Sequence, residues 1–178
     1  MAELILVRHG ETDWNRESRY QGHADPPLNE AGREQAQELA RILEPLELDA
    51  IYTSDLRRAS ETAEIIHAGR DIPLVLHDGL REVDVGSWSG MTHAEIERRF
   101  PGATTHDGES RDAFRGRVVG AVTAIAARHD GARILIVSHG GSLRAVLSHA
   151  LRDDSVPRVE NCAIYKLAFR DGVLCGID

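Results

Sequence analysis

The chain has 178 residues, of which 42% are hydrophobic and 28% are charged. This length is typical of one domain, so residues 1–178 are expected to fold as a single unit. The composition is ordinary for a soluble globular protein. A net charge of −8 at pH 7 argues against general binding to nucleic acid. A local cluster of arginines can still bind a small anion, because charges beyond a Debye length of about 8 Å are screened.

Cysteine usage and hydropathy indicate where the protein works. If Asp171 and Gly172 form a two-residue hairpin turn, Cys175 lies well away from Cys162, so we expect free thiols and no disulfide. The longest apolar run, residues 118–127, is about half of what a membrane span requires. The N-terminus carries charged residues where a secretory signal would be apolar. These features predict a cytoplasmic protein without a membrane partner.

An apolar strand, a short polar turn and a helical pattern follow one another three times. The three strands are expected at residues 4–7, 50–53 and 133–137. Ser54 is the expected cap of the helix after the second strand, and the helix after the third begins near Gly141. Continuous apolar strands that alternate with helices favour a parallel sheet covered on both faces. The predicted fold is therefore α/β, a three-layer α/β/α sandwich with a mostly parallel sheet.

The remaining segments supply further helices and one hairpin. Helical patterns lie within residues 28–43, 91–100 and 109–131, with Gly131 just past the end of the last helix. Thr92 and Glu95 form a capping-box pattern at the start of the second, and Ser110 is a plausible cap for the third. Residues 161–177 alternate imperfectly around an Asp-Gly turn, which predicts a hairpin that adds an antiparallel edge to the sheet.

Basic side chains follow the ends of the three predicted strands. They are Arg8 and His9, then Arg57 and Arg58, and finally His139. Ligands of open α/β sheets bind beyond the carboxyl ends of the strands, so the architecture brings these side chains to one rim. A guanidinium offers a planar fork of donors that matches phosphate oxygens. Gly10, Gly140 and Gly141 permit close backbone approach, and the helix start near Gly141 adds N–H groups. The cluster predicts a pocket for a dianionic phosphate.

Each of these residues alone also has a simpler interpretation. An arginine pair such as Arg57 and Arg58 is commonly a solvated helix start, and His139 can be a turn histidine. A metal site is the main alternative for the histidines. The chain has no His-x-x-x-His pair and no Cys/His cluster, so no metal is expected. It also lacks the glycine patterns of nucleotide-binding loops.

Five segments resemble, in order, the motifs of the histidine phosphatase superfamily, which is also called the phosphoglycerate mutase-like family. They read LVRHGETDWN, YQGHADPPLNEAGREQA, SDLRRASETA, LREVDVGSWSG and VSHGGSLRAVL. The resemblance extends along most of the chain. It places the phosphate-binding arginine at Arg58, with Arg57 at a variable position.

The resemblance also implies a role for each catalytic candidate. His9 is the expected nucleophile, which forms a phosphohistidine, and nearby arginines favour its neutral form. Arg8, Arg58 and His139 hold the phosphate oxygens. Glu82 gives a proton to the leaving group and later takes one from water. Further substrate contacts are expected at Asn15, Gln21, Gly22 and Gly140.

Two departures from the family pattern concern the substrate end of the site. His23 follows Gly22, where an aromatic residue is common, and the segment FPGATTHD lacks a tryptophan often found there. The segment between Glu82 and Ser110 has 27 residues, which resembles the short form of the phosphatase branch. Mutases of the family carry extra chain here.

The sequence therefore predicts a metal-independent phosphomonoester hydrolase that acts on a small phosphorylated metabolite through a phosphohistidine. No cofactor is expected, and the sequence leaves the oligomeric state open, with a homodimer as one option. One alternative is a 2,3-bisphosphoglycerate-dependent phosphoglycerate mutase. A non-catalytic phosphate-binding protein is a second, but such a protein would be expected to have lost some of the catalytic residues, and all are present.

Overall fold

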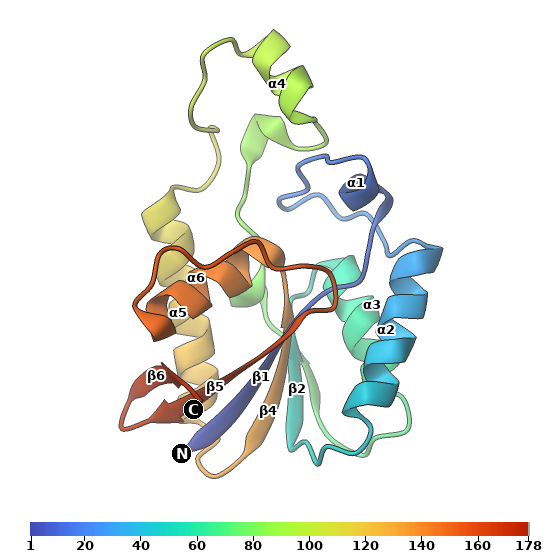
Figure 1. Cartoon of the computed structure of the whole chain (residues 1–178), viewed down its shortest axis with the longest axis vertical. Helices are drawn as coiled ribbons and strands as arrows, with labels where there is room; N and C mark the ends of the chain where they lie inside the picture. The colour runs from blue at the N-terminus through green and yellow to red at the C-terminus, as the bar shows by residue number, and fades with distance from the viewer. Residues whose placement is uncertain (178) are drawn as a thin grey trace.

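The computed structural model describes residues 1–177, in which one six-stranded sheet lies between two layers of helices (Figure 1). The strands are β1 (Ala2–Arg8), β2 (Ala50–Thr53), β3 (Leu74–Leu76), β4 (Arg133–Ser138), β5 (Ile164–Arg170) and β6 (Val173–Gly176). Their order is β3-β2-β4-β1-β5-β6. The first four of these pair in parallel, whereas β5 is antiparallel to β1, and β6 to β5. The predicted mixed sheet with an antiparallel edge is confirmed.

The predicted strands lie within two residues of the observed ones, and the hairpin pairs as expected. Cys175 faces Ala168 across it, and both cysteines are free thiols. Strand β3 was not predicted. It has three residues, two of which, Val75 and Leu76, are exposed, so it carries no alternation from which a strand could be recognised.

The helices are α1 (Asp13–Arg16), α2 (Glu30–Leu43), α3 (Arg57–His67), α4 (His93–Arg99), α5 (Arg111–Ala127) and α6 (Gly140–Leu151), with short 3₁₀ turns η1 (Asp78–Leu80) and η2 (Gly86–Trp88). The predicted caps at Thr92 and Ser110 are confirmed. The cap at Ser54 is wrong, because the N-cap position of α3 is Leu56. Ser54 lies two residues too early, and its hydroxyl oxygen accepts from the Leu56 N–H instead.

Alternate side chains of the central strands enter two separate cores. Leu4 and Leu6 of β1 pack with α5 and α6, whereas Ile5 and Val7 pack with α2 and α3. All four are fully buried, and burial of such a side chain stabilises a fold by about 1.5–3 kcal/mol. These two cores confirm the three-layer sandwich.

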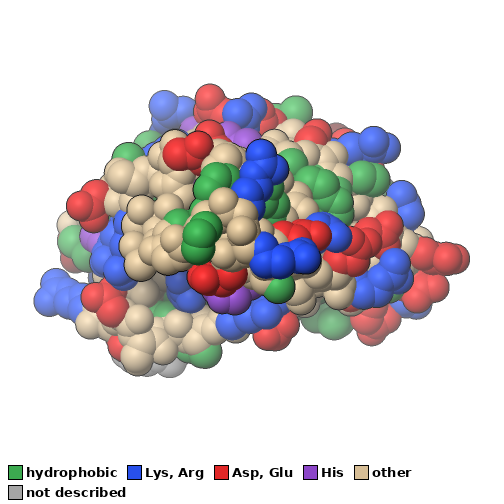
Figure 2. Space-filling view, turned by 90° about the horizontal axis from the view of Figure 1, so that it is seen from above, with side chains coloured by type: hydrophobic (Ala, Val, Ile, Leu, Met, Phe, Trp, Pro, Cys, Tyr) green, Lys and Arg blue, Asp and Glu red, His purple; other side chains and the backbone are tan. Residues whose placement is uncertain are grey.

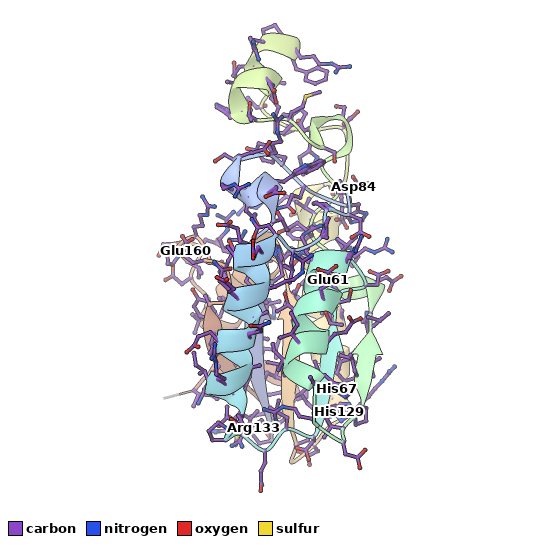
Figure 3. All side chains as sticks on the ribbon, turned by 90° about the vertical axis from the view of Figure 1, so that its right-hand side faces the viewer. Glu61, His67, Asp84, His129, Arg133 and Glu160 are labelled. Atoms are coloured by element: carbon purple, nitrogen blue, oxygen red, sulfur yellow. The ribbon has the colours of Figure 1, made fainter. Side chains whose placement is uncertain are left out.

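The parallel strands end at the same edge of the sheet, and α1 and α4 lie beyond that edge (Figure 1). Arg133 and His129 lie at the opposite end, far from Asp84 (Figure 3). Within residues 1–177, no helix combines the length and apolar character needed to cross a bilayer. The fold thus exposes one rim, at the carboxyl ends of β1, β2 and β4, for a ligand.

Candidate active site

The structure brings four of the predicted residues together at this rim. Arg8 is the last residue of β1 and His9 follows it, His139 follows β4, and Arg58 lies in the first turn of α3. Their exposed fractions are 6%, 2%, 0% and 1% for Arg8, His9, His139 and Arg58. The imidazole centroids of His9 and His139 are 5.2 Å apart. Two guanidinium groups and two imidazoles therefore share one buried site.

Arg57 and Arg58 are neighbours in sequence with opposite surroundings. The side chain of Arg57 is 59% exposed and pairs with Glu61 at 2.8 Å. The Arg58 guanidinium turns inward and donates to the carbonyls of Gly22 at 2.9 Å and Ala24 at 2.8 Å. The loop after α1 thus holds the inward arginine in place, and the solvated interpretation applies to Arg57 alone.

Four buried side-chain nitrogen atoms in this site have no hydrogen-bond partner. They are Arg8 Nε, Arg58 Nε and both ring nitrogens of His139, and residues 1–177 hold no other such atom. A buried polar group without a partner costs about 1–3 kcal/mol, and folded proteins contain few of them. Their gathering at one point fits a site whose partner is an anion with several acceptor oxygens.

Burial and positive charge keep both histidines neutral. Burial, followed by the charges of Arg58 and Arg8, holds the pKa of His9 well below its usual 6.5. The pKa of His139 is lowered well below 6.5 by burial first, then by Arg58, His9 and Arg8. Burial also lowers the pKa of Arg58 to about 10, partly offset by Glu82 and Asp25, so this guanidinium stays charged at neutral pH.

Glu82 reaches the same site from an irregular segment after η1. Its carboxylate accepts hydrogen bonds from the N–H groups of Val83 at 2.9 Å and Gly141 at 2.8 Å. A Cβ atom at residue 141 would push this carboxylate aside, so glycine lets it lie where it does. Gly140 gives similar room to Arg8, whose Nε lies 3.3 Å from an added Cβ position. The start of α6 is therefore shaped around a carboxylate and a guanidinium.

The residues predicted as further substrate contacts differ in how they are connected to the site. Gly22 has φ +50° and gives its carbonyl to Arg58, so it supports the site through that residue. The Gln21 side chain accepts from the Thr12 hydroxyl. Asn15, the third residue of α1, accepts from the N–H of the N-cap Thr12 in a capping box, and it also lines a cavity of about 300 Å³. Asn15 and Gln21 lie near the site with their oxygen atoms already engaged.

Two supporting residues were not found from the sequence. The Asn161 side chain donates to the His9 carbonyl at 2.9 Å. Thr62 accepts from the Gly10 N–H at 3.1 Å and donates to the Arg58 carbonyl at 2.8 Å. Asn161 could have been located from the pairing of the hairpin with β1. Thr62 lies four residues after Arg58 on α3, which is one helical turn.

The positive charge of the site is buried, and the surface around it is mixed. Figure 2 views the molecule from the α4 end and shows basic, acidic and hydrophobic side chains interspersed. Among residues 1–177, no group of three or more His, Cys, Asp or Glu side chains is placed to hold a metal ion. The donors that face the site are instead the nitrogen atoms of arginine and histidine.

Comparison with known proteins identifies the family of the chain. The family model of the histidine phosphatase superfamily (branch 1) matches residues 4–174. The chain belongs to this superfamily. As a histidine phosphatase it is a phosphoric monoester hydrolase, and its mixed sheet is that of phosphoglycerate mutase-like structures.

Individual relatives of this histidine phosphatase span most of its length. The chain is 41% identical to phosphoglycerate mutase-like protein 4 of Arabidopsis thaliana, over 84% of this chain and 71% of that one. It is 36% identical to a metal-independent phosphoserine phosphatase of the same plant, over 96% and 78%. The solved structure of Bacillus stearothermophilus YhfR superposes with a TM-score of 0.90 at 38% identity, covering 98% of this chain and 94% of that one.

Proposed function

We propose that the protein hydrolyses phosphomonoesters without a metal, through a phosphohistidine formed on His9. The observation that carries this proposal is the group of unpaired buried nitrogen atoms of Arg8, Arg58 and His139 around a neutral His9. A relative that is 36% identical to this chain is named as a metal-independent phosphoserine phosphatase, which supports chemistry without a metal. Two arginines already supply the positive charge that phosphoryl transfer needs.

The hydrogen bond at His9 Nδ1 selects the attacking nitrogen. Nδ1 lies 2.6 Å from the Gly10 carbonyl oxygen. Because a carbonyl can only accept, Nδ1 carries the proton and donates it, which leaves the lone pair on Nε2. The lowered pKa keeps this lone pair free of a proton at neutral pH. Asn161 fixes the adjoining backbone through the His9 carbonyl, so Nε2 is the nucleophile that the structure supports.

In the first step, His9 Nε2 attacks phosphorus, and the bond between phosphorus and the ester oxygen breaks. The proton of the Glu82 carboxylic acid passes to the leaving oxygen, so an alcohol departs and Glu82 becomes a carboxylate. Arg8, Arg58 and His139 donate to the remaining phosphoryl oxygens, where charge develops.

In the second step, water attacks the phosphohistidine and gives one proton to the Glu82 carboxylate. The P–N bond breaks, inorganic phosphate forms, and His9 returns to its neutral form. Two displacements thus replace one difficult step. Glu82 ends protonated and ready for the next ester.

The proposed substrate is a small phosphorylated metabolite. A cavity of about 700 Å³ is lined by Gly141, beside the Glu82 carboxylate, and by Val83, Trp88, Phe114 and Arg144. This volume suits a small molecule, and its wall combines apolar side chains with a cation. It would hold the alcohol part of the ester. We also propose that the protein works in the cytoplasm, where its two free thiols would stay reduced.

A phosphoglycerate mutase is the second candidate, because a 41% identical relative is named phosphoglycerate mutase-like protein 4. The two candidates differ in where the phosphoryl group goes. Incubation with 3-phosphoglycerate and 2,3-bisphosphoglycerate distinguishes them. A hydrolase releases inorganic phosphate, whereas a mutase interconverts the monophosphates and releases almost none.

The test of the proposed function is phosphate release from p-nitrophenyl phosphate in the presence of EDTA. We expect wild-type activity that falls at least about 10⁴-fold in His9→Ala, as expected for loss of a nucleophile. His129→Ala is the matched control, because His129 pairs with Tyr52 at the opposite end of the sheet. Equal activity in wild type and His9→Ala, or activity that EDTA abolishes, would refute the proposal.

A further inference from the structure

Arg117, in the second turn of α5, makes an unusual set of contacts with the segment that carries Glu82. Its Nη1 donates to the carbonyls of Gly79 at 3.1 Å and Arg81 at 3.0 Å, and its Nη2 donates to the carbonyl of Glu82 at 3.1 Å. Residues 81–85 form no helix or strand. Carbonyls in such a segment need partners from elsewhere. One guanidinium serves two of them, those of Arg81 and Glu82, and also the carbonyl of Gly79 in η1.

Arg117 is itself held by Glu109. The carboxylate of Glu109 accepts from Arg117 Nε at 2.9 Å and Nη2 at 2.6 Å, which is a bidentate pair. These side chains are 26% and 17% exposed, and this hydrogen bond lowers the pKa of Glu109. The Glu109 N–H also donates to the Asp84 carbonyl at 2.8 Å. The pair therefore clamps the backbone on both sides of Glu82.

The carboxylate of Glu82 contacts the start of α6, next to the site. It contacts the N–H groups of Val83 and Gly141, with Gly141 two residues after His139. Arg117 forms no hydrogen bond with this carboxylate among residues 1–177, and its contacts reach Glu82 through the main chain. It can therefore set where the carboxyl group lies without entering the chemistry.

We propose that Arg117, held by Glu109, is a positioning residue for the acid Glu82. This inference rests on the proposed function, in which Glu82 protonates the leaving oxygen. A misplacement of about 1 Å can cost about 100-fold in rate. Loss of the Arg117–Glu109 pair should therefore slow the cleavage of esters whose leaving group needs a proton. Esters with a stable leaving anion should be little affected.

The experiment compares two esters under single-turnover conditions, with enzyme in excess, so that only the first step is measured. One is an alkyl phosphate, which needs the proton, and the other is p-nitrophenyl phosphate, which does not. We expect Arg117→Leu to slow alcohol release from the alkyl ester about 100-fold. Release of nitrophenolate should change less than about threefold, because proton donation matters little there.

Arg133→Leu is the matched control. Arg133 also pairs with a glutamate, Glu3, at 2.8 Å and donates to the carbonyl of Glu47 at 3.2 Å, but it does so at the opposite end of the sheet. Its side chain is 36% exposed. We expect both esters to react at wild-type rates in this variant. A selective loss in Arg133→Leu, or equal loss with both esters in Arg117→Leu, would overturn the positioning role.

Glu109→Gln serves if Arg117→Leu does not fold. The amide keeps the size of the side chain but removes the charge that holds Arg117, so we expect the selective loss at about tenfold, within the range of charge-assisted hydrogen bonds. No selective loss would overturn the proposal. If the wild-type protein releases product from neither ester, the proposed function itself is wrong. If it cleaves both, only the positioning role is under test.

Discussion

The arginines at the two ends of the sheet show how a structural arginine differs from one that is placed to bind a ligand. At the amino end of β4, Arg133 is partly exposed and its hydrogen bonds go to Glu3 and Glu47. At the carboxyl ends, Arg8 and Arg58 are almost fully buried, yet their Nε atoms have no partner. Burial raises the free-energy cost of a donor that has no hydrogen-bond partner. Arg8 and Arg58 are nevertheless both more deeply buried and less completely hydrogen-bonded than Arg133.

The histidines repeat this contrast. His129, near Arg133 at the base of the molecule (Figure 3), lies 2.9 Å from the Tyr52 hydroxyl. His139 is fully buried and neither ring nitrogen has a partner. The end of the sheet with unmet donors is the end that Glu82 also reaches. An incomplete hydrogen-bond network, rather than the number of charges, therefore marks the functional end.

The contrast is sharpest between Arg58 and Arg57, so substitution of each by Met is expected to give the largest difference. Arg58→Met removes a guanidinium that faces the transferred phosphoryl group and should lower kcat/KM about 10³-fold. Arg57→Met removes an exposed ion pair with Glu61, and such pairs contribute about 0–1 kcal/mol. Steady-state assays measure the effect. Similar losses of kcat/KM in the two variants would refute the assignment of phosphate binding to Arg58 alone of the two.

Carboxylates at the two ends allow a second comparison. Glu82→Gln keeps the shape of the acid but removes its proton, and should slow hydrolysis of an alkyl phosphate about 10²-fold or more. Glu3→Gln changes the partner of Arg133 at the far end and should leave the rate within experimental error. A full rate in Glu82→Gln would show that another group protonates the leaving oxygen.

A bound anion should stabilise the protein through the carboxyl end alone. At about 100 times its dissociation constant, inorganic phosphate should raise the free energy of unfolding by about 2.7 kcal/mol. Arg58→Met should lose most of this increment, whereas Arg133→Leu should retain it. Urea denaturation with and without phosphate measures the effect. Equal stabilisation of both variants would place the anion outside the site.

The smallest expected effect comes from the pH dependence of stability. His9 and His139 have pKa values below 6.5 in the folded protein, so below that pH the unfolded chain binds more protons. Their contribution to stability is fully present above pH 6.5 and is lost as the pH falls from about 6.5 toward the lower pKa values of the folded protein. Each histidine contributes a slope of about 1.4 kcal/mol per pH unit.

His139→Gln tests this assignment, because glutamine has no ionisable group. Urea denaturation at several pH values above and below 6.5 should give a shallower slope for the variant, reduced by the share of one histidine. Identical slopes in the variant and the wild type would mean that His139 is protonated in the folded protein.

The fold was predictable where the sequence has strong local patterns. Apolar runs located β1, β2 and β4, and capping patterns located the starts of α4 and α5. The four-residue α1 and the three-residue β3 were missed, since neither is long enough to show a period. The cap at Ser54 failed because the turn after β2 carries two more residues before α3 begins.

The candidate site was predictable where it follows strand ends, and less so where it depends on packing. The residues alone could not separate Arg58 from Arg57, and the family resemblance did so. Asn161 and Arg117 carry no motif, and their roles appear only when β5 pairs with β1 and α5 packs on the segment before Glu82. Such contacts join residues far apart in sequence, which no local pattern encodes.

The most direct test of the central claim is to locate the phosphoryl group during turnover. The protein is mixed with excess ester in EDTA, quenched in base, where a phosphohistidine survives, and its peptides are analysed by mass spectrometry. The account predicts one phosphoryl group on His9 that acid removes and that His9→Ala does not form. A phosphoryl group on another residue, or steady turnover without any phosphorylated peptide, would contradict it.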